Sequence, residues 1–194
     1  MESLLMKDAY QQEALSDLFL SWTLRAAADN FPHKQKQPKL NIKCRKILSK
    51  LIYGLELENQ IKETDKVISV DVWRQWNHID LHANIILEID GKEEYHLLVI
   101  ENKAYTPIHD NQLKRYKDLI DKVYGNDPDL KLFDRHFILI TFLDDNTDTY
   151  KTMEQECIKE GYQCIPILDL QGNDVPQNEE TESDIFNEFW LRSW

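Results

Sequence analysis

Apolar residues recur at helical spacing in the first third of the chain. Between Ser3 and Asp29 they repeat every three or four positions, which predicts one or two amphipathic helices. A polar connector with two prolines follows from Phe31 to Leu40. A second helical pattern then begins near Ile42 and is expected to end near Gly54, with apolar residues on one face and lysines on the other.

The hydrophobic period changes to two after this helix. Alternating β-branched residues from Val67 to Trp73 predict a strand, and Leu55–Ile61 is a candidate for a shorter one. Strict alternation from Ile79 to Ile89 predicts the next strand. The Asp90-Gly91 pair favours a two-residue type I′ turn, so Tyr95–Lys103 is expected to be the partner strand of a hairpin.

Helical and strand patterns alternate in the second half of the chain. The expected elements are a helix from Thr106-Pro107 to about Tyr124, a strand at Phe133–Leu143, a helix at Thr147–Glu160 closed by Gly161, a strand at Tyr162–Leu168 and an amphipathic helix from Ile185 to Trp194. This order predicts one α/β domain over residues 1–194, with helices flanking a mixed central sheet.

Charge is unevenly distributed along the chain. The formal net charge of −12 argues against a general polyanion binder. Residues 30–55, however, contain seven Lys and Arg residues and no Asp or Glu, which is compatible with a nucleic-acid-binding surface and equally with an ordinary solvated helix face. The candidate nucleic-acid contacts are Lys39, Lys43, Arg45, Lys46 and Lys50.

Cysteine spacing and hydropathy narrow the class of protein further. The three cysteines show no metal-binding spacing, and they are expected to be reduced core residues. No apolar stretch is long enough for a membrane span, and the first residues do not form a secretory signal pattern. A cytoplasmic location with no membrane partner is therefore expected.

The predicted hairpin brings two carboxylates together. With a two-residue loop at Asp90-Gly91, Asp80 lies directly opposite Glu101. Such neighbours have Cβ atoms about 4.5–5.5 Å apart, and like charges there are destabilising. Either Lys103, on the same face as Glu101, or a divalent cation is expected to compensate for the repulsion. An added bulge residue would shift this register.

Asp80, the run Glu101-Asn102-Lys103 at the end of an apolar strand, and a following helix with Gln112 and Tyr116 resemble the PD-(D/E)XK phosphodiesterase superfamily. More narrowly, Val72–Tyr116 is similar to bacterial PD-(D/E)XK nuclease-like proteins with an IENK core, and the helix is similar to the QxxxY motif of RecB-type nucleases. Ile79 stands where the motif's name has Pro.

The resemblance implies a fold and its boundaries. It implies a restriction-endonuclease-like core of order α-β-β-β-α-β with a mixed central sheet, over about residues 42–143. A helical N-terminal extension, residues 1–40, and a C-terminal helix-strand-helix, residues 145–194, would then be additions to this core.

The resemblance also implies roles for particular residues. Asp80 and Glu101, with the backbone carbonyl of Asn102, would bind Mg²⁺, for which Mn²⁺ would substitute. Lys103 would orient the attacking water and stabilise developing negative charge. Gln112 and Tyr116 would lie beside the site, one helical turn apart.

The resemblance also implies a further glutamate, that of the first motif, before the first core strand. Glu56 and Glu58 are the candidates, and Glu58 is preferred. The simpler interpretation of the constellation remains open, in which Asp80 and Glu101 are surface carboxylates and Lys103 is their ion-pair partner.

The function implied is Mg²⁺-dependent hydrolysis of phosphodiester bonds in DNA, with RNA as the alternative polymer. A catalytically inactive protein of the same fold that binds nucleic acid or another protein is the second hypothesis. Homo-oligomerisation and a protein partner are left open. Trp73, Trp76 and Tyr105 are candidates for stacking on bases, although burial in the core is the favoured role for Trp73.

Overall fold

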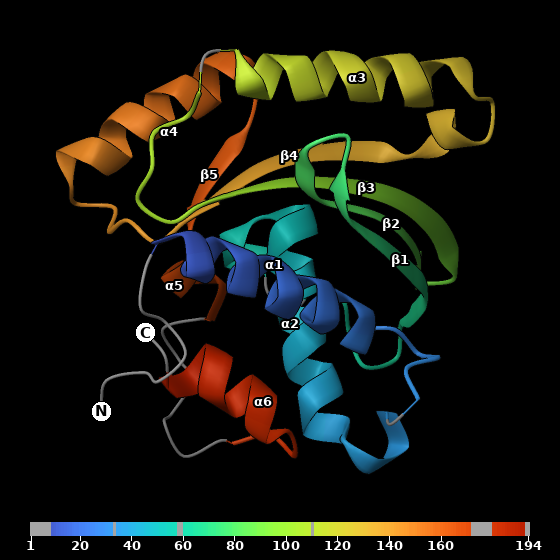
Figure 1. Ribbon diagram of the computed structural model, residues 1–194. Helices are drawn as coiled ribbons and strands as arrows, with labels where there is room; N and C mark the ends of the chain where they lie inside the picture. Colours follow the sequence, from blue (N-terminus) through green and yellow to red (C-terminus); the bar gives the residue numbers. More distant parts are fainter. Residues whose placement is uncertain (1–8, 33, 58–59, 110, 172–179, 193–194) are drawn as a thin grey trace.

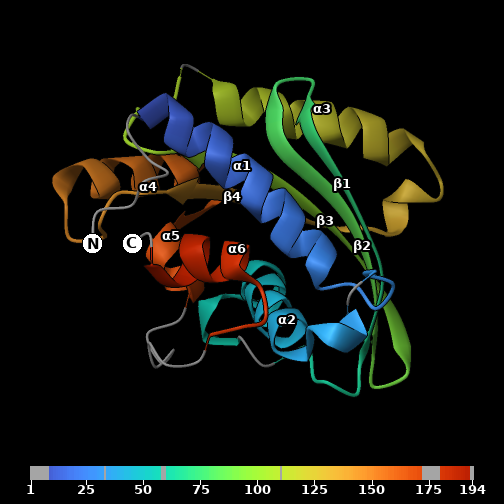
Figure 2. The ribbon, with the colours of Figure 1, turned by 60° about the horizontal axis from the view of Figure 1, so that its bottom comes forward.

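The computed structural model describes residues 9–32, 34–57, 60–109, 111–171 and 180–192. A five-stranded sheet of order β1-β2-β3-β4-β5 forms the middle layer. Helices α3 and α4 cover one face of this sheet, and α1 and α2 cover the other (Figure 1). The turned view shows α6 beside α2, on the same side of the sheet as α1 (Figure 2). The α/β fold with a mixed sheet between helices is confirmed.

The first three strands are antiparallel and the last two add in parallel. β1 pairs with β2 and β2 with β3 in antiparallel register, whereas β3 pairs with β4 and β4 with β5 in parallel register. This arrangement makes β1 an edge strand and places β3 at the centre. The strand bounds are β1 Lys66–Trp76, β2 Ile79–Ile89, β3 Lys92–Lys103, β4 Asp134–Thr141 and β5 Gln163–Pro166.

Several helix ends follow their local signals. Pro38 opens its helix at the first turn, where its missing N–H costs nothing. Thr147 caps Tyr150 N, and Gly161 closes the same helix in the left-handed conformation. None of the described helices is both long and apolar enough to cross a membrane. The helix bounds are α1 Ala9–Ala26, α2 Pro38–Tyr53, α3 Gln112–Asn126, α4 Asp148–Glu160, α5 Ile167–Gln171 and α6 Asp184–Phe186, the last continued by a π-helical segment at Asn187–Arg192.

Two tight turns fix the register of the antiparallel strands. Asp90 and Gly91 both have positive φ, 48° and 78°, as a type I′ turn requires, and Ile89 pairs with Lys92 across it. The predicted two-residue loop is confirmed. Asn77 and His78, with φ of 50° and 70°, form a second turn of this kind between β1 and β2. β1 therefore extends to Trp76, beyond the predicted strand.

Some predicted element boundaries are wrong. α3 begins at Gln112 and not at Thr106-Pro107. Residues 105–109 are instead a loop, in which the Thr106 hydroxyl donates a hydrogen bond to Glu13 of α1 at 3.0 Å. The described residues of the segment predicted as a short strand, 55–57 and 60–61, form a 3₁₀ turn at Leu55–Leu57 and no strand. The last strand stops at Pro166, where α5 takes over, and Trp194 lies outside the described residues.

The sheet separates two hydrophobic cores. The larger lies between the sheet and α1, α2, α5 and α6, and it includes Leu81, Ile85 and Ile100. The smaller lies under α3 and α4, and Ile79 packs there, not with Leu81 as the alternation predicts. The expected burial of Trp73 is also wrong, because an edge strand leaves its side chain 44% exposed.

Some of the basic residues between positions 30 and 55 are buried and bind groups inside the fold. The guanidinium of Arg45 is buried and donates to the backbone carbonyls of Ala27, Lys62 and Asp65. It also forms an ion pair with Asp29, with Nη2 and Oδ1 2.5 Å apart. These bonds tie α2 to the chain segments before and after it, so Arg45 holds loops together from within.

Replacing Arg45 by Met is expected to lower the free energy of unfolding by about 3 kcal/mol, because Asp29 and three carbonyls lose their buried donor. Urea denaturation measures this change. The exposed Lys36, replaced in the same way, is expected to change it by less than about 0.5 kcal/mol. Equal stabilities of the two variants would contradict the structural role of Arg45.

Candidate active site

The carboxylates of Asp80 and Glu101 meet at one end of the sheet. The pairing of β2 with β3 runs from Ile89 and Lys92 to Leu81 and Ile100, and Asp80 and Glu101 are the next residues on the two strands. Glu101 is only 2% exposed. Its Oε1 accepts a hydrogen bond from Gln112 Nε2 at 2.5 Å and lies 2.8 Å from Lys103 Nζ.

Two hydrogen bonds from the adjacent strands hold the carboxylate of Asp80. Its Oδ2 accepts the backbone N–H of Asn102 at 2.9 Å, and its Oδ1 accepts Gln75 Nε2 at 3.0 Å. Gln75 lies near the end of β1 with a positive φ of 56°. The turn between β1 and β2 thus supplies a donor that fixes the carboxylate of Asp80.

Two acidic residues of α1 also reach this end of the sheet, and the sequence analysis missed both. Asp17 accepts a hydrogen bond from the Asn102 side chain, and its Oδ2 accepts Gln75 Nε2 at 3.3 Å. Glu13 Oε1 accepts the backbone N–H of Ala104 at 2.9 Å. The signal for Asp17 is its spacing, because it lies three, four and seven residues before the buried positions 20, 21 and 24.

α3 contributes Gln112 and Tyr116 to the same site. Gln112 Nε2 donates to Tyr116 Oη at 2.9 Å as well as to Glu101, and both α3 side chains are buried. The Tyr116 hydroxyl donates to the backbone carbonyl of His78, 2.5 Å away. The structure therefore brings together the IENK segment, Asp80 and the QxxxY helix.

Burial and mutual repulsion perturb these acids. Burial, together with the charge of Asp80, raises the pKa of Glu101 to about 8. The same two causes, in the same order, raise the pKa of Asp17 to about 7. Burial lowers the pKa of Lys103, but the carboxylates of Glu101 and Asp80 raise it by more. The site therefore holds more carboxyl groups than its one lysine can keep ionised.

Three buried oxygen atoms at the site receive no hydrogen bond from any described residue. They are Glu101 Oε2, Asn102 Oδ1 and Gln112 Oε1. Buried oxygens without donors are costly, and carboxylate and amide oxygens are the ligands that hard divalent cations prefer. Within the described ranges no three His, Cys, Asp or Glu side chains are grouped as a metal site. A cation here would thus depend on amide, backbone or water oxygens as well as Asp80 and Glu101.

A sequence model of the PD-(D/E)XK nuclease superfamily matches residues 5–189. The chain belongs to the PD-(D/E)XK nuclease superfamily. The match spans both α1, which carries Asp17, and the hairpin and α3 that carry the rest of the site. No curated protein and no solved structure matches the chain.

The remaining candidates of the sequence analysis lie elsewhere in this superfamily member. Glu56 is exposed in the 3₁₀ turn after α2, and Glu58 lies outside the described residues. The chain that follows meets the far end of the hairpin, where Lys62 Nζ is 3.2 Å from Asp90 Oδ1. The structure therefore does not bring Glu56 to Asp80.

The basic candidates divide into interior and surface residues. Arg45 is buried, and so is Lys50, whose Nζ donates to the backbone carbonyl of Asp169 at 2.9 Å. Lys39 is exposed, and Lys43 and Lys46 are half-buried. Nucleic-acid binding by the latter three stays a prediction.

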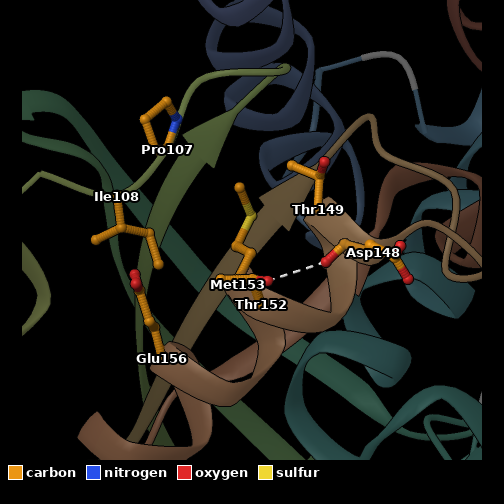
Figure 3. A pocket seen from close by; sticks show the side chains of 7 residues that line it. All are labelled: Pro107, Ile108, Asp148, Thr149, Thr152, Met153 and Glu156. Carbon is orange, nitrogen blue, oxygen red and sulfur yellow. Dashed lines mark hydrogen bonds between the residues drawn. The ribbon is translucent and has the colours of Figure 1, made fainter.

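A hollow of about 310 Å³ adjoins the loop that follows Lys103 (Figure 3). Pro107 and Ile108 of this loop face Met153 and Glu156 of α4, and Glu156 points toward Ile108. Asp148 is a second acid among the lining residues. The hollow therefore combines an apolar wall with negative charge, which disfavours a phosphate ligand.

The free energy of unfolding of Asp17→Asn, measured in EDTA, is expected to rise relative to that of wild type as the pH increases from 5 to 8. A carboxyl whose folded-state pKa is raised binds its proton more tightly when folded, so the wild type loses stability as pH rises through about 7. The stability difference between variant and wild type is expected to grow by about 1–3 kcal/mol over this range. Urea denaturation at both pH values measures it.

Asp118→Asn, on the exposed face of α3, is the matched control and is expected to show no such growth. A difference that is the same at pH 5 and pH 8 for Asp17→Asn would contradict the buried, repelled state of the Asp17 carboxyl.

Proposed function

We propose that this protein is a divalent-metal-dependent nuclease that hydrolyses phosphodiester bonds in DNA. The proposal rests on one observation above all, the buried Glu101 Oε2 and Gln112 Oε1, which receive no hydrogen bond from a described residue and belong to side chains that contact each other beside Lys103. Membership of a nuclease superfamily agrees with it. Mg²⁺ is the proposed ion, with Mn²⁺ as its substitute, because all available ligand atoms are oxygens.

Asp80, Glu101 and the backbone carbonyl of Asn102 are the proposed ligands. The direction of the Asn102 carbonyl supports this choice. In a strand, the N–H and the C=O of one residue point to the same side, and the N–H of Asn102 donates to Asp80. The carbonyl of Asn102 is therefore directed toward the strand that carries Asp80, and not toward β4.

The bound cation would lower the pKa of a water molecule and neutralise charge on phosphoryl oxygens. The proposed role of Lys103 is to hold a water by hydrogen bonding and to place a positive charge beside the scissile phosphate. Its ion pair with Glu101 fixes the ammonium group on the face that carries the carboxylates. Buried and paired, Lys103 stays protonated at neutral pH, so it acts as a hydrogen-bond donor.

Gln112 and Tyr116 are proposed to position the carboxylate of Glu101. Gln112 donates to Glu101 and to Tyr116 through one amide nitrogen, and Tyr116 anchors the pair on the turn between β1 and β2. Asp17 acts through Asn102 and Gln75, which both contact Asp80. These side chains hold the ligand oxygens in place before a cation binds, which lowers the cost of ordering them.

Lys103→Met is expected to reduce Mg²⁺-dependent cleavage of plasmid and single-stranded DNA by at least about 100-fold, because the charge beside the phosphate is lost. Gel assays of initial rates measure cleavage, and isothermal titration with Mn²⁺ measures metal binding, which this variant is expected to retain. Lys122→Met, on an exposed position of α3, is the matched control and is expected to cleave like wild type. Equal rates of Lys103→Met and wild type would refute the role of Lys103.

Asp80→Asn is expected to weaken Mn²⁺ binding by at least about ten-fold and to abolish cleavage, because one ligand charge is removed. Circular dichroism confirms folding of the variant. Asp118→Asn serves again as the matched control and is expected to leave both readouts unchanged. Wild-type protein that binds DNA but yields no products with Mg²⁺ or Mn²⁺ would support the inactive binding protein in place of the nuclease.

A further inference from the structure

The indole ring of Trp73 presents an open aromatic surface on the edge of the sheet. The side chain is 44% exposed, and none of the described strands pairs with the outer side of β1. One side of the ring stacks on His82 of β2, with ring centres 5.0 Å apart and an angle of 27° between the planes. Only the inner part of the indole packs on His82. The exposed part therefore remains available for stacking on another ring.

The support beneath Trp73 is rigid. His82 is 6% exposed, also stacks with Trp76 at 4.9 Å, and pairs through Nε2 with the Tyr124 hydroxyl. Tyr124 in turn donates to Asn84 at 2.7 Å. A preformed aromatic surface loses little entropy when a ligand stacks on it.

Trp73 lies next to the candidate active site. It pairs directly with His82 across β1 and β2, and Asp80 is two residues before His82 on the same strand. Gln75, two residues after Trp73, donates to Asp80. Diagonal neighbours of this kind are about 7–8 Å apart, which is within reach of an indole ring. A strand with its phosphate at Asp80 and Glu101 therefore passes close to Trp73.

The charges around the site favour this side for a polyanion. Arg74, the neighbour of Trp73, and Arg115, whose guanidinium carbon lies 5.5 Å from the centre of the Tyr116 ring, are both exposed. The hollow on the other side, next to α4, is lined by Asp148 and Glu156 (Figure 3). A phosphate backbone is attracted to the arginines and repelled by the acids.

We infer that Trp73 stacks on an unpaired nucleobase next to the scissile phosphate, so that the substrate is single-stranded or locally unpaired. This inference rests on the proposed nuclease function and names its substrate class. Inside a duplex both faces of a base are covered by neighbouring bases, so only an unstacked base offers a face to the indole. Every base has such a face, so the contact carries little sequence preference.

Fluorescence anisotropy with a labelled single-stranded oligothymidylate tests the inference. All proteins carry Lys103→Met and are assayed with Mg²⁺, so that binding is measured without turnover. Adding Trp73→Ala is expected to weaken binding by about 5- to 100-fold, the effect of losing one base stack, whereas Trp73→Phe is expected to stay within about three-fold. A strand of the same length without bases is expected to bind equally well to the proteins with and without the Trp73→Ala substitution.

Ile68→Ala is the matched control, because Ile68 is 38% exposed at the other end of β1. It is expected to leave the affinity unchanged. Equal affinities of the Trp73→Ala and Ile68→Ala proteins for the single strand would overturn the inference, as would an equal effect of Trp73→Ala on the strand without bases.

The two proposals fail in distinguishable ways. Cleavage by wild-type protein, together with no effect of Trp73→Ala on single-strand binding, leaves the nuclease proposal standing and removes the stacking contact. Wild-type protein that neither cleaves nor binds any of the strands overturns the nuclease function and the stacking contact with it.

Discussion

The burial of several carboxylates at one end of a sheet is the constraint on which the site depends. Asp80 and Glu101 lie at the ends of two neighbouring strands, close enough for their charges to interact, and Asp17 approaches them from a helix. Without compensation such a group would favour protonation or an open structure. Neighbouring donors offset part of this cost. Lys103 and Gln112 bind the carboxylate of Glu101, and Gln75 donates a hydrogen bond to Asp80. The donor-less oxygens that remain leave the site electrostatically suited to a cation.

The architecture brings these groups together from both faces of the sheet. α3 lies on one face and reaches Glu101 through Gln112, whereas α1 lies on the other and reaches Asn102 through Asp17. Alternation along β3 allows this, because consecutive residues at its end point to opposite faces. A single strand end thus couples two helices that are far apart in the sequence, and loosening either helix would alter the same carboxylates.

Net charge gives a poor picture of how this chain uses its basic residues. The sequence of residues 30–55 suggests a basic surface, because it contains seven Lys and Arg residues and no acid. In the structure, however, Arg45 and Lys50 are buried and donate hydrogen bonds to backbone carbonyls. The exposed arginines next to the site, Arg74 and Arg115, come from a strand edge and from α3. Charge near the reacting groups therefore depends on which faces the fold leaves open, and not on local density of Lys and Arg.

Local interactions determined the part of the site that the sequence analysis found. The Asp90-Gly91 turn sets a two-residue loop, and from it the pairing of β2 with β3 follows by counting as far as Leu81 and Ile100, which brings Asp80 and Glu101 to neighbouring strand ends. The one-turn spacing of Gln112 and Tyr116 places both on one helix face. Thr147 and Gly161 likewise end α4 through contacts within a few residues.

Tertiary structure alone decided the rest, because the interactions involved join distant segments. The Thr106 hydroxyl donates to Glu13 of α1, ninety-three residues away, and the loop around it continues until α3 begins at Gln112. Asp17 joins the site through a partner eighty-five residues away, which no local pattern predicts. Trp73 is a large aromatic residue of the kind that usually packs in a core. The order of the strands, however, places β1 at an edge of the sheet, and the Trp73 ring stays exposed to solvent. Local spacing fixes which residues share a face, whereas only packing decides what that face meets.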